Sequence, residues 1–113
     1  MQMEDRIVGN VLVLRPMTST IDASVSILFK GKIIDWTTKG YHLIVLDLSE
    51  VEFMDSSGLG ILMSLLKTLG KEGRLVLCHI HDSVRSLFKI TRVDRIIPIC
   101  SDVDDAIQRI NQA

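Results

Sequence analysis

Two adjacent hydroxyls, Ser56 and Ser57, are the residues of this chain best suited to chemistry, and they lie in the octapeptide FMDSSGLG that begins at position 53. Asp55 precedes them, and Gly58 and Gly60 follow. The octapeptide separates the most strand-like stretch from the most helical one, which predicts both serines in the first turn of a helix. The first N–H groups of a helix lack partners and carry partial positive charge, so they tolerate an anion. The motif therefore suits reversible phosphorylation, although Asp, Ser and Gly are also ordinary helix caps.

Two enzymatic uses of such a chain fit the residues less well. A phospho-aspartate receiver would use Asp47 and needs acidic residues after the first strand to hold Mg²⁺, but residues 15–18 there read RPMT. The last predicted strand also lacks a lysine at its end. A serine hydrolase would need Ser56 or Ser57 in a Gly-x-Ser-x-Gly elbow with a histidine base; no such elbow is present, and the chain has three histidines. We therefore expect a protein that is not an enzyme.

The cysteines and histidines do not form a recognisable metal motif. Cys78 and Cys100 lie in apolar, strand-like runs, which predicts buried free thiols. His79 and His81 would share one face of a strand, but no further ligand follows at a recognisable spacing. We therefore expect no metal site and no cofactor.

Length and composition indicate one small globular domain, residues 1–113. The chain is 47% hydrophobic and 24% charged, with a formal net charge of −1, so no basic field points to nucleic acid or anionic lipid. The first residues do not resemble a signal peptide, and no apolar run is long enough to span a membrane. The expected location is the cytoplasm.

Strand and helix patterns alternate along the chain, which predicts an α/β fold with a small mixed or parallel sheet of about four to five strands and flanking helices. The predicted strands are a hairpin over 6–15 that turns at Gly9-Asn10, then 42–48, 74–79 and 95–99, the last at a sheet edge because of Pro98. The predicted helices run from the N-cap Asp22 to 38, from the serine motif to Leu69, from the N-cap Asp82 onward, and from Ser101 or Asp102 to Ile110. Val25, Leu28, Phe29 and Ile33 form the expected core face of the first helix.

The helix that follows the serine motif has an unusually smooth outer face. At 100° per residue its core side collects Leu62, Leu65, Leu66 and Leu69, with Gly58 and Leu59 close by. The outer side collects Ser56, Ser57, Gly60, Ser64, Lys67 and Thr68, with Ile61 and Met63 at its flanks. A glycine inside a helix costs about 1 kcal/mol relative to alanine, and Gly60 has no structural reason visible in the sequence. Close approach by a protein partner would supply one.

The run IVLDL at 44–48, followed by FMDSSGLG, closely resembles the signature of bacterial anti-sigma factor antagonists, the STAS-domain family. The resemblance extends to Ile21-Asp22-Ala23, to 83–99 and to 103–107, and so covers almost the whole chain. It implies a small sheet flanked by helices. It also implies that Ser56 is phosphorylated by a serine kinase, a GHKL-type ATPase that doubles as the anti-sigma factor, and that a PP2C-type phosphatase removes the phosphate.

Two positions depart from the family pattern. Ser19 stands where the family usually has a glycine near the phosphorylation site, and Arg92 stands where many members have a glycine after the third helix. The first affects expected partner contacts around Asp22, and the second costs local strain if a left-handed cap is kept. Neither removes the Ser56 hydroxyl.

The sequence thus predicts a phosphorylation-controlled anti-sigma factor antagonist that binds the kinase when unphosphorylated. Ser56 is the expected acceptor, Asp55 would orient its hydroxyl, Ser57 would cap the helix, Asp22 would lie near the kinase contact, and Gly58, Gly60, Ile61 and Met63 would form the docking surface. ATP and Mg²⁺ would belong to the kinase. The alternative is a constitutive STAS interaction subunit of a lipid-transport or stressosome-like assembly, in which the serine is never modified.

Overall fold

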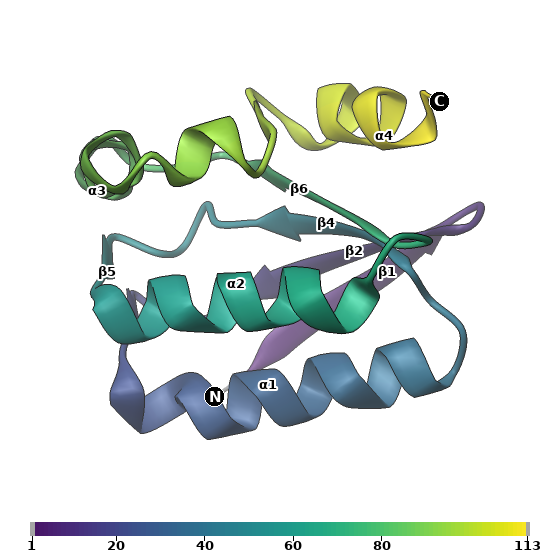
Figure 1. Cartoon of the computed structure of the whole chain (residues 1–113), viewed down its shortest axis with the longest axis horizontal. Helices are drawn as coiled ribbons and strands as arrows, with labels where there is room; N and C mark the ends of the chain where they lie inside the picture. The colour runs from purple at the N-terminus through teal and green to yellow at the C-terminus, as the bar shows by residue number, and fades with distance from the viewer. Residues whose placement is uncertain (1, 113) are drawn as a thin grey trace.

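The computed structural model describes residues 2–112, which form two sheets and four α-helices (Figure 1). The strands are β1 (Met3–Val8), β2 (Val11–Pro16), β3 (Thr20–Ile21), β4 (Leu43–Asp47), β5 (Phe53–Met54), β6 (Arg74–Cys78) and β7 (Ile99–Cys100). The helices are α1 (Ala23–Thr38), α2 (Ser56–Leu69), α3 (Asp82–Thr91) and α4 (Val103–Asn111), with a 3₁₀ helix η1 (Val93–Arg95). None of the helices in this part of the chain is long and apolar enough to cross a membrane.

The main sheet is mixed and has five strands in the order β1-β2-β4-β6-β7. β1 and β2 form the antiparallel hairpin that the sequence predicted, with Gly9 at φ 62° in its turn. The other neighbours, β2-β4, β4-β6 and β6-β7, are parallel. The predicted α/β class is therefore confirmed, as are the five strands of the main sheet and the edge position of the strand after Pro98.

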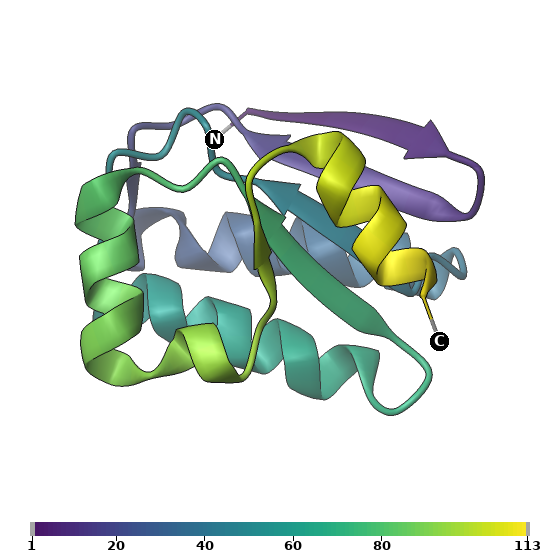
Figure 2. The ribbon, with the colours of Figure 1, turned by 90° about the horizontal axis from the view of Figure 1, so that it is seen from above.

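Alternating side chains of the central strands build two separate cores. Leucines and isoleucines of β2, β4 and β6 face α1, α2 and α3, whereas valines of the same strands and Cys78 face α4. Figures 1 and 2 show the same arrangement, with α1 and α2 on one side of the sheet and α4 on the other. Because one residue step in a strand changes the face, each strand is apolar throughout, as expected for a sheet covered on both sides.

Three element predictions were wrong in detail. Asp82 is not the N-cap of the third helix. The helix begins one residue earlier than predicted, so Asp82 is its first helical residue and His81 holds the N-cap position. The predicted strand over 95–99 is mostly η1 and a turn, and Ile99–Cys100 alone pairs with β6. In α1, Leu28 is 54% exposed, since this helix buries only the narrow side that carries Phe29 and Ile33.

Arg92 keeps the backbone conformation of the glycine that it replaces. It ends α3 with φ 63° and ψ 20°, in the left-handed region that favours glycine. The departure at Arg92 therefore preserves the turn into η1, and the strain expected from the sequence is present.

Candidate functional site

A second, two-stranded sheet brings the two N-cap aspartates of α1 and α2 together. β3 and β5 pair in parallel, with Ile21 opposite Met54. Asp22 comes directly after β3 and caps α1, and Asp55 comes directly after β5 and caps α2. Parallel strands lie about 4.8 Å apart, so the N-termini of α1 and α2 are neighbours at one end of the molecule. Neither strand could be recognised from the sequence, because a strand of two residues has no periodicity, although the repeated order apolar–Asp–small at 21–23 and 54–56 was a usable signal.

The loop before β3 is held by Ser19, one of the two departures from the family pattern. Its carbonyl oxygen accepts hydrogen bonds from the backbone N–H groups of Glu52 (2.8 Å) and Phe53 (3.0 Å). Both bonds use backbone atoms, and Ser19 is not among the residues with positive φ. The serine at position 19 therefore does not disturb the backbone hydrogen bonds that link the segment before β3 to the segment before β5.

Asp55, and not Ser57, caps α2. Its Oδ1 atom accepts hydrogen bonds from the N–H groups of Ser57 (2.9 Å) and Gly58 (3.2 Å). The prediction that Ser57 is the cap was wrong because the helix begins at Ser56, which places the acid at the N-cap position. The carboxylate is thus engaged with the backbone, and no hydrogen bond joins it to the Ser56 hydroxyl among residues 2–112.

We expect replacement of Asp55 by alanine to destabilise the protein by about 1 kcal/mol, since two N–H groups of α2 lose their acceptor. Ser57→Ala is the matched control and should change stability by no more than about 0.5 kcal/mol, as for an ordinary surface substitution. Urea denaturation of the three proteins measures both values. An equal loss in the two variants would contradict the assignment of the cap.

Ser56 is exposed at the first position of α2, and its hydroxyl makes no hydrogen bond within the described part of the chain. The carboxylates of Asp22 and Asp55 lie at the same end of the helix pair. Hydrogen bonds from the hydroxyl (2.5 Å) and then the N–H (2.9 Å) of Ser24 lower the pKa of Asp22, which keeps it ionised. Because Asp55 already occupies the free N–H groups of Ser57 and Gly58, a phosphate on Ser56 would project into solvent beside two negative charges.

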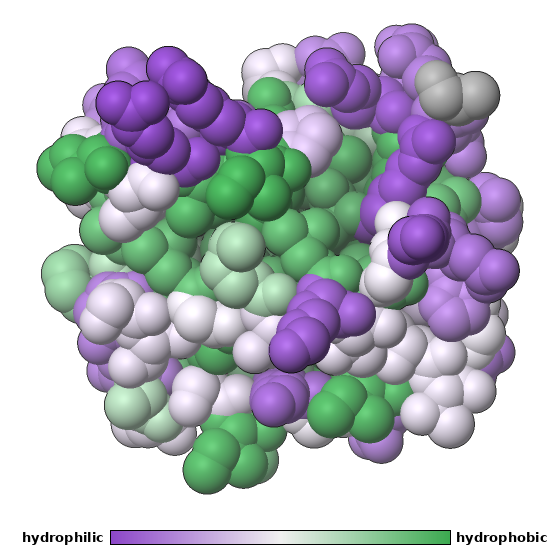
Figure 3. Space-filling model, in the orientation of Figure 1, coloured by the Kyte–Doolittle hydropathy of each residue, from purple (hydrophilic) through white to green (hydrophobic). Residues whose placement is uncertain are grey.

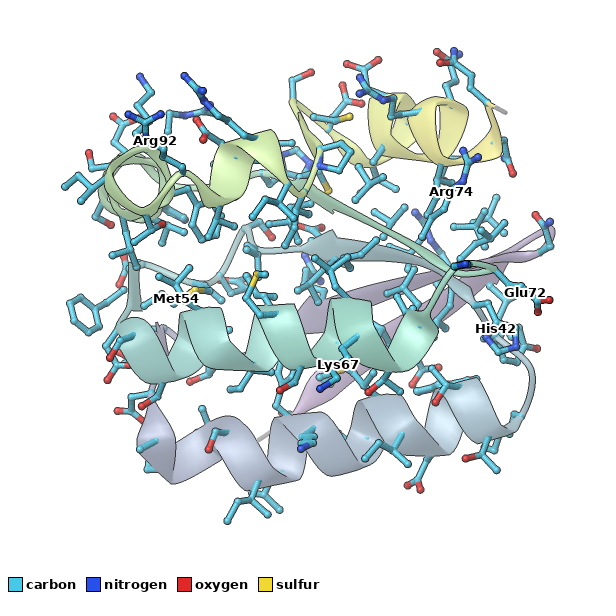
Figure 4. All side chains as sticks on the ribbon, viewed as in Figure 1. His42, Met54, Lys67, Glu72, Arg74 and Arg92 are labelled. Atoms are coloured by element: carbon cyan, nitrogen blue, oxygen red, sulfur yellow. The ribbon has the colours of Figure 1, made fainter. Side chains whose placement is uncertain are left out.

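The outer side of α2 presents one continuous row of exposed residues. This α2 stripe consists of Ser56, Gly60, Met63 and Lys67, spaced by four, three and four residues. Figure 3 shows α2 as a pale band of weakly polar side chains, and Figure 4 shows Lys67 on it. The predicted place of Gly60 on the outer face is confirmed, and Met63, which was predicted at the flank of that face, is exposed as well. An added Cβ at Gly60 would meet no atom within 4 Å.

Gly58 and Ile61, which the sequence assigned to the docking surface, are buried. Ile61 is 7% exposed and packs in the core between α2 and α1. A Cβ at Gly58 would lie 2.9 Å from the carbonyl oxygen of Ile21 and would overlap Met54, which Figure 4 shows beside the start of α2. The glycine is therefore required for close packing of α2 on β3 and β5.

An apolar groove adjoins α2 on the side away from α1. Strongly apolar side chains gather above α2 in Figure 3, between it and the upper helices. The groove is lined by Leu66 of α2, Leu75 and Val76 of β6, Ile96, Pro98 and Ile110, with Arg74 and Arg109 at its rim. Apolar surface therefore lies next to the α2 stripe.

Comparison with known proteins assigns this architecture. The family model of the STAS domain matches residues 2–106. This chain belongs to the STAS domain family. A Thermotoga maritima protein named as a candidate anti-sigma factor antagonist is 30% identical over 109 residues, which cover 95% of this chain and 96% of that protein. The anti-sigma-B factor antagonist of Listeria monocytogenes is 35% identical over 80 residues, 70% of each chain. The crystal structure of an anti-sigma factor antagonist from Mycobacterium paratuberculosis has a TM-score of 0.89 at 25% identity, covering 98% of this chain and 94% of that one.

In this STAS domain Asp47 and His81, which the sequence offered for enzymatic roles, have structural partners. Asp47, considered for a receiver, is 8% exposed and its Oδ1 accepts a hydrogen bond from the N–H of Ser49 (2.9 Å). The ring of His81 lies 2.6 Å from the Ser49 carbonyl oxygen. Ser56 is not hydrogen-bonded to any histidine of the described residues. The Ser56 hydroxyl is thus exposed and free of hydrogen bonds within the described residues.

Proposed function

We propose that this protein is a phosphorylation-controlled anti-sigma factor antagonist. Unphosphorylated at Ser56, it binds an anti-sigma factor that is also a GHKL-type serine kinase, and that partner then releases its target. A PP2C-type phosphatase restores the binding form. The observation that carries the proposal is the exposed, unbonded Ser56 hydroxyl at the head of the α2 stripe, next to two N-cap carboxylates. The family and the names of the relatives support the class of partner.

The switch works through the docked state and leaves the fold unchanged. A phosphate adds about −1.5 to −2 charges at pH 7. In the free protein it stays in water, because Asp55 occupies the backbone N–H groups of Ser57 and Gly58. In the complex the partner would bury it against Asp22 and Asp55, which costs both desolvation and like-charge repulsion. Each 1.4 kcal/mol of that cost lowers the affinity about tenfold.

The docking surface proposed here is smaller than the one predicted from the sequence. Ser56, Gly60 and Met63 would contact the partner, with Lys67 at the far end of the stripe and Asp22 beside Ser56. Gly58 and Ile61 would act from beneath by fixing the position of α2, and the half-buried Ser57 would lie at the edge of the surface. Residues 1–113 would act as one domain in the cytoplasm, and the ATP and Mg²⁺ of the reaction would belong to the kinase.

Phosphorylation of the purified protein by an anti-sigma factor kinase encoded beside its gene tests the proposal. After incubation with Mg²⁺ and ATP, phosphopeptide mass spectrometry should find one phosphate, on Ser56. Ser56→Ala should abolish the modification, and Ser57→Ala should leave it in place. A stable complex with no phosphate on Ser56 would instead support the constitutive interaction subunit.

A further inference from the structure

Asp47, Cys78 and Cys100 lie in one row across the carboxyl ends of three parallel strands. Cys78 of β6 pairs in register with Asp47 of β4 on one side and with Cys100 of β7 on the other. Residues in register on neighbouring strands point to the same face of a sheet, and here that face is the one covered by α4. The proposed switch at Ser56 uses none of these side chains.

His79 joins this row because β6 ends at Cys78. Its φ of 54° is in the left-handed region, which breaks the alternation that would send the side chain to the opposite face. A carboxylate oxygen of Asp47, the Cys78 sulfur and a ring nitrogen of His79 all lie within 4.8 Å of one another. Asp47 and Cys78 are buried and His79 is exposed, so the group has one side open to solvent.

We propose that Asp47, Cys78 and His79 form a binding site for a divalent cation of the Zn²⁺ class. Thiolate and imidazole ligands select such a cation over Mg²⁺ or Ca²⁺, which prefer oxygen ligands. A tetrahedral zinc site with bonds of about 2.0–2.3 Å places its ligand atoms about 3.5 Å apart, so these side chains would close by about 1 Å. Water would hold the fourth position.

Charge and hydrogen bonding around the group are compatible with a bound cation. One carboxylate and one thiolate balance the two positive charges of the ion, and the Cys78 proton leaves to solvent on binding. The Asp47 Oδ1 atom is held by the Ser49 N–H, which leaves Oδ2 for the metal. Arg15, a cationic side chain close enough to interact electrostatically with Asp47, is already bridged to Glu4 at 2.6 Å.

The sequence could not show this site because its ligands come from two strands 31 positions apart. It offered the pair His79 and His81, but the ring of His81 lies against the Ser49 carbonyl. The register between β4 and β6 supplies the acid instead.

Titration of the purified full chain with Co²⁺ tests the inference, because a thiolate–cobalt bond gives a charge-transfer absorption that oxygen ligands do not. We expect one cobalt per chain, displaced by Zn²⁺. Cys78→Ser should remove the absorption band, and His79→Gln should lower the affinity by more than about tenfold, since even the loss of an outer partner of a metal ligand costs that much. Cys100→Ser and His81→Gln are the matched controls and should bind as the parent does.

Three results would overturn the site: no charge-transfer band with the parent protein, unchanged affinity in His79→Gln, or an equal loss in Cys100→Ser and Cys78→Ser. His79 is exposed, so its variant should fold normally, and far-UV circular dichroism of every variant checks this. The test is independent of Ser56 and needs no kinase.

Discussion

Replacing Ser56 with aspartate is expected to weaken binding of the protein to its anti-sigma factor by about 100-fold or more, with little change in thermal stability. The new carboxylate would stand at the head of the α2 stripe next to Asp22 and Asp55, and the partner would have to bury it there. A cost of about 2.8 kcal/mol in the complex alone gives this factor. In the free protein an acid in the first turn of a helix is favourable by about 0.3–1 kcal/mol, which offsets repulsion by the neighbouring carboxylates.

Isothermal titration calorimetry against the purified anti-sigma factor measures the effect. Ser56→Ala removes the hydroxyl without adding charge and should bind within about threefold of the parent. Gln108→Glu adds the same negative charge on α4, on the other side of the sheet, and should bind like the parent. Equal losses for Ser56→Asp and Gln108→Glu would point to net charge in place of a local contact, and a Ser56→Asp protein that binds normally would remove the basis of the switch.

Long elements could be read from the sequence because their patterns are long. Strands β2, β4 and β6 are apolar runs buried on both faces, and α2 and α4 carry a repeating core side, so each was found at nearly its observed bounds. Asp22 was identified as an N-cap because it immediately precedes a helix, and for α4 the structure selects Asp102 from the two candidates, Ser101 and Asp102. Ser56 and Ser57 were singled out together because they stand where a strand-like run meets a helix. The family resemblance then selected Ser56, and the structure exposes it.

Features that depend on contacts between distant segments could not be read. The pairing of β3 with β5 decides that α2 begins at Ser56, and this changed the cap from Ser57 to Asp55. The same pairing buries Gly58, whose neighbours Ile21 and Met54 come from different strands. The sequence could not distinguish the two glycines of the motif. Tertiary packing shows that Gly58 lies in a tight contact with Ile21 and Met54, whereas Gly60 lies on the surface.

Substitution of these two glycines by alanine should therefore have opposite effects on stability. At Gly58 the added methyl group would lie 2.9 Å from the Ile21 carbonyl oxygen and would overlap the Met54 side chain. The Met54 side chain can move aside, but the Ile21 carbonyl group belongs to the backbone of β3 and cannot move as easily. Overpacking of this kind costs about 1–3 kcal/mol, and the gain of about 1 kcal/mol in helix propensity offsets only part of it. We expect Gly58→Ala to lose up to about 2 kcal/mol of unfolding free energy.

Gly60→Ala is the matched control, two residues along the same helix. Its methyl group meets no atom within 4 Å, so the helix propensity term acts alone and the protein should gain up to about 1 kcal/mol. Urea denaturation of the parent and both variants measures the difference, which should reach up to about 3 kcal/mol between the two substitutions. A Gly58→Ala protein as stable as Gly60→Ala would mean that α2 can move away from β3 and β5. The position of Ser56 beside Asp22 would then not be fixed, and the proposed switch, which depends on it, would lose its structural basis.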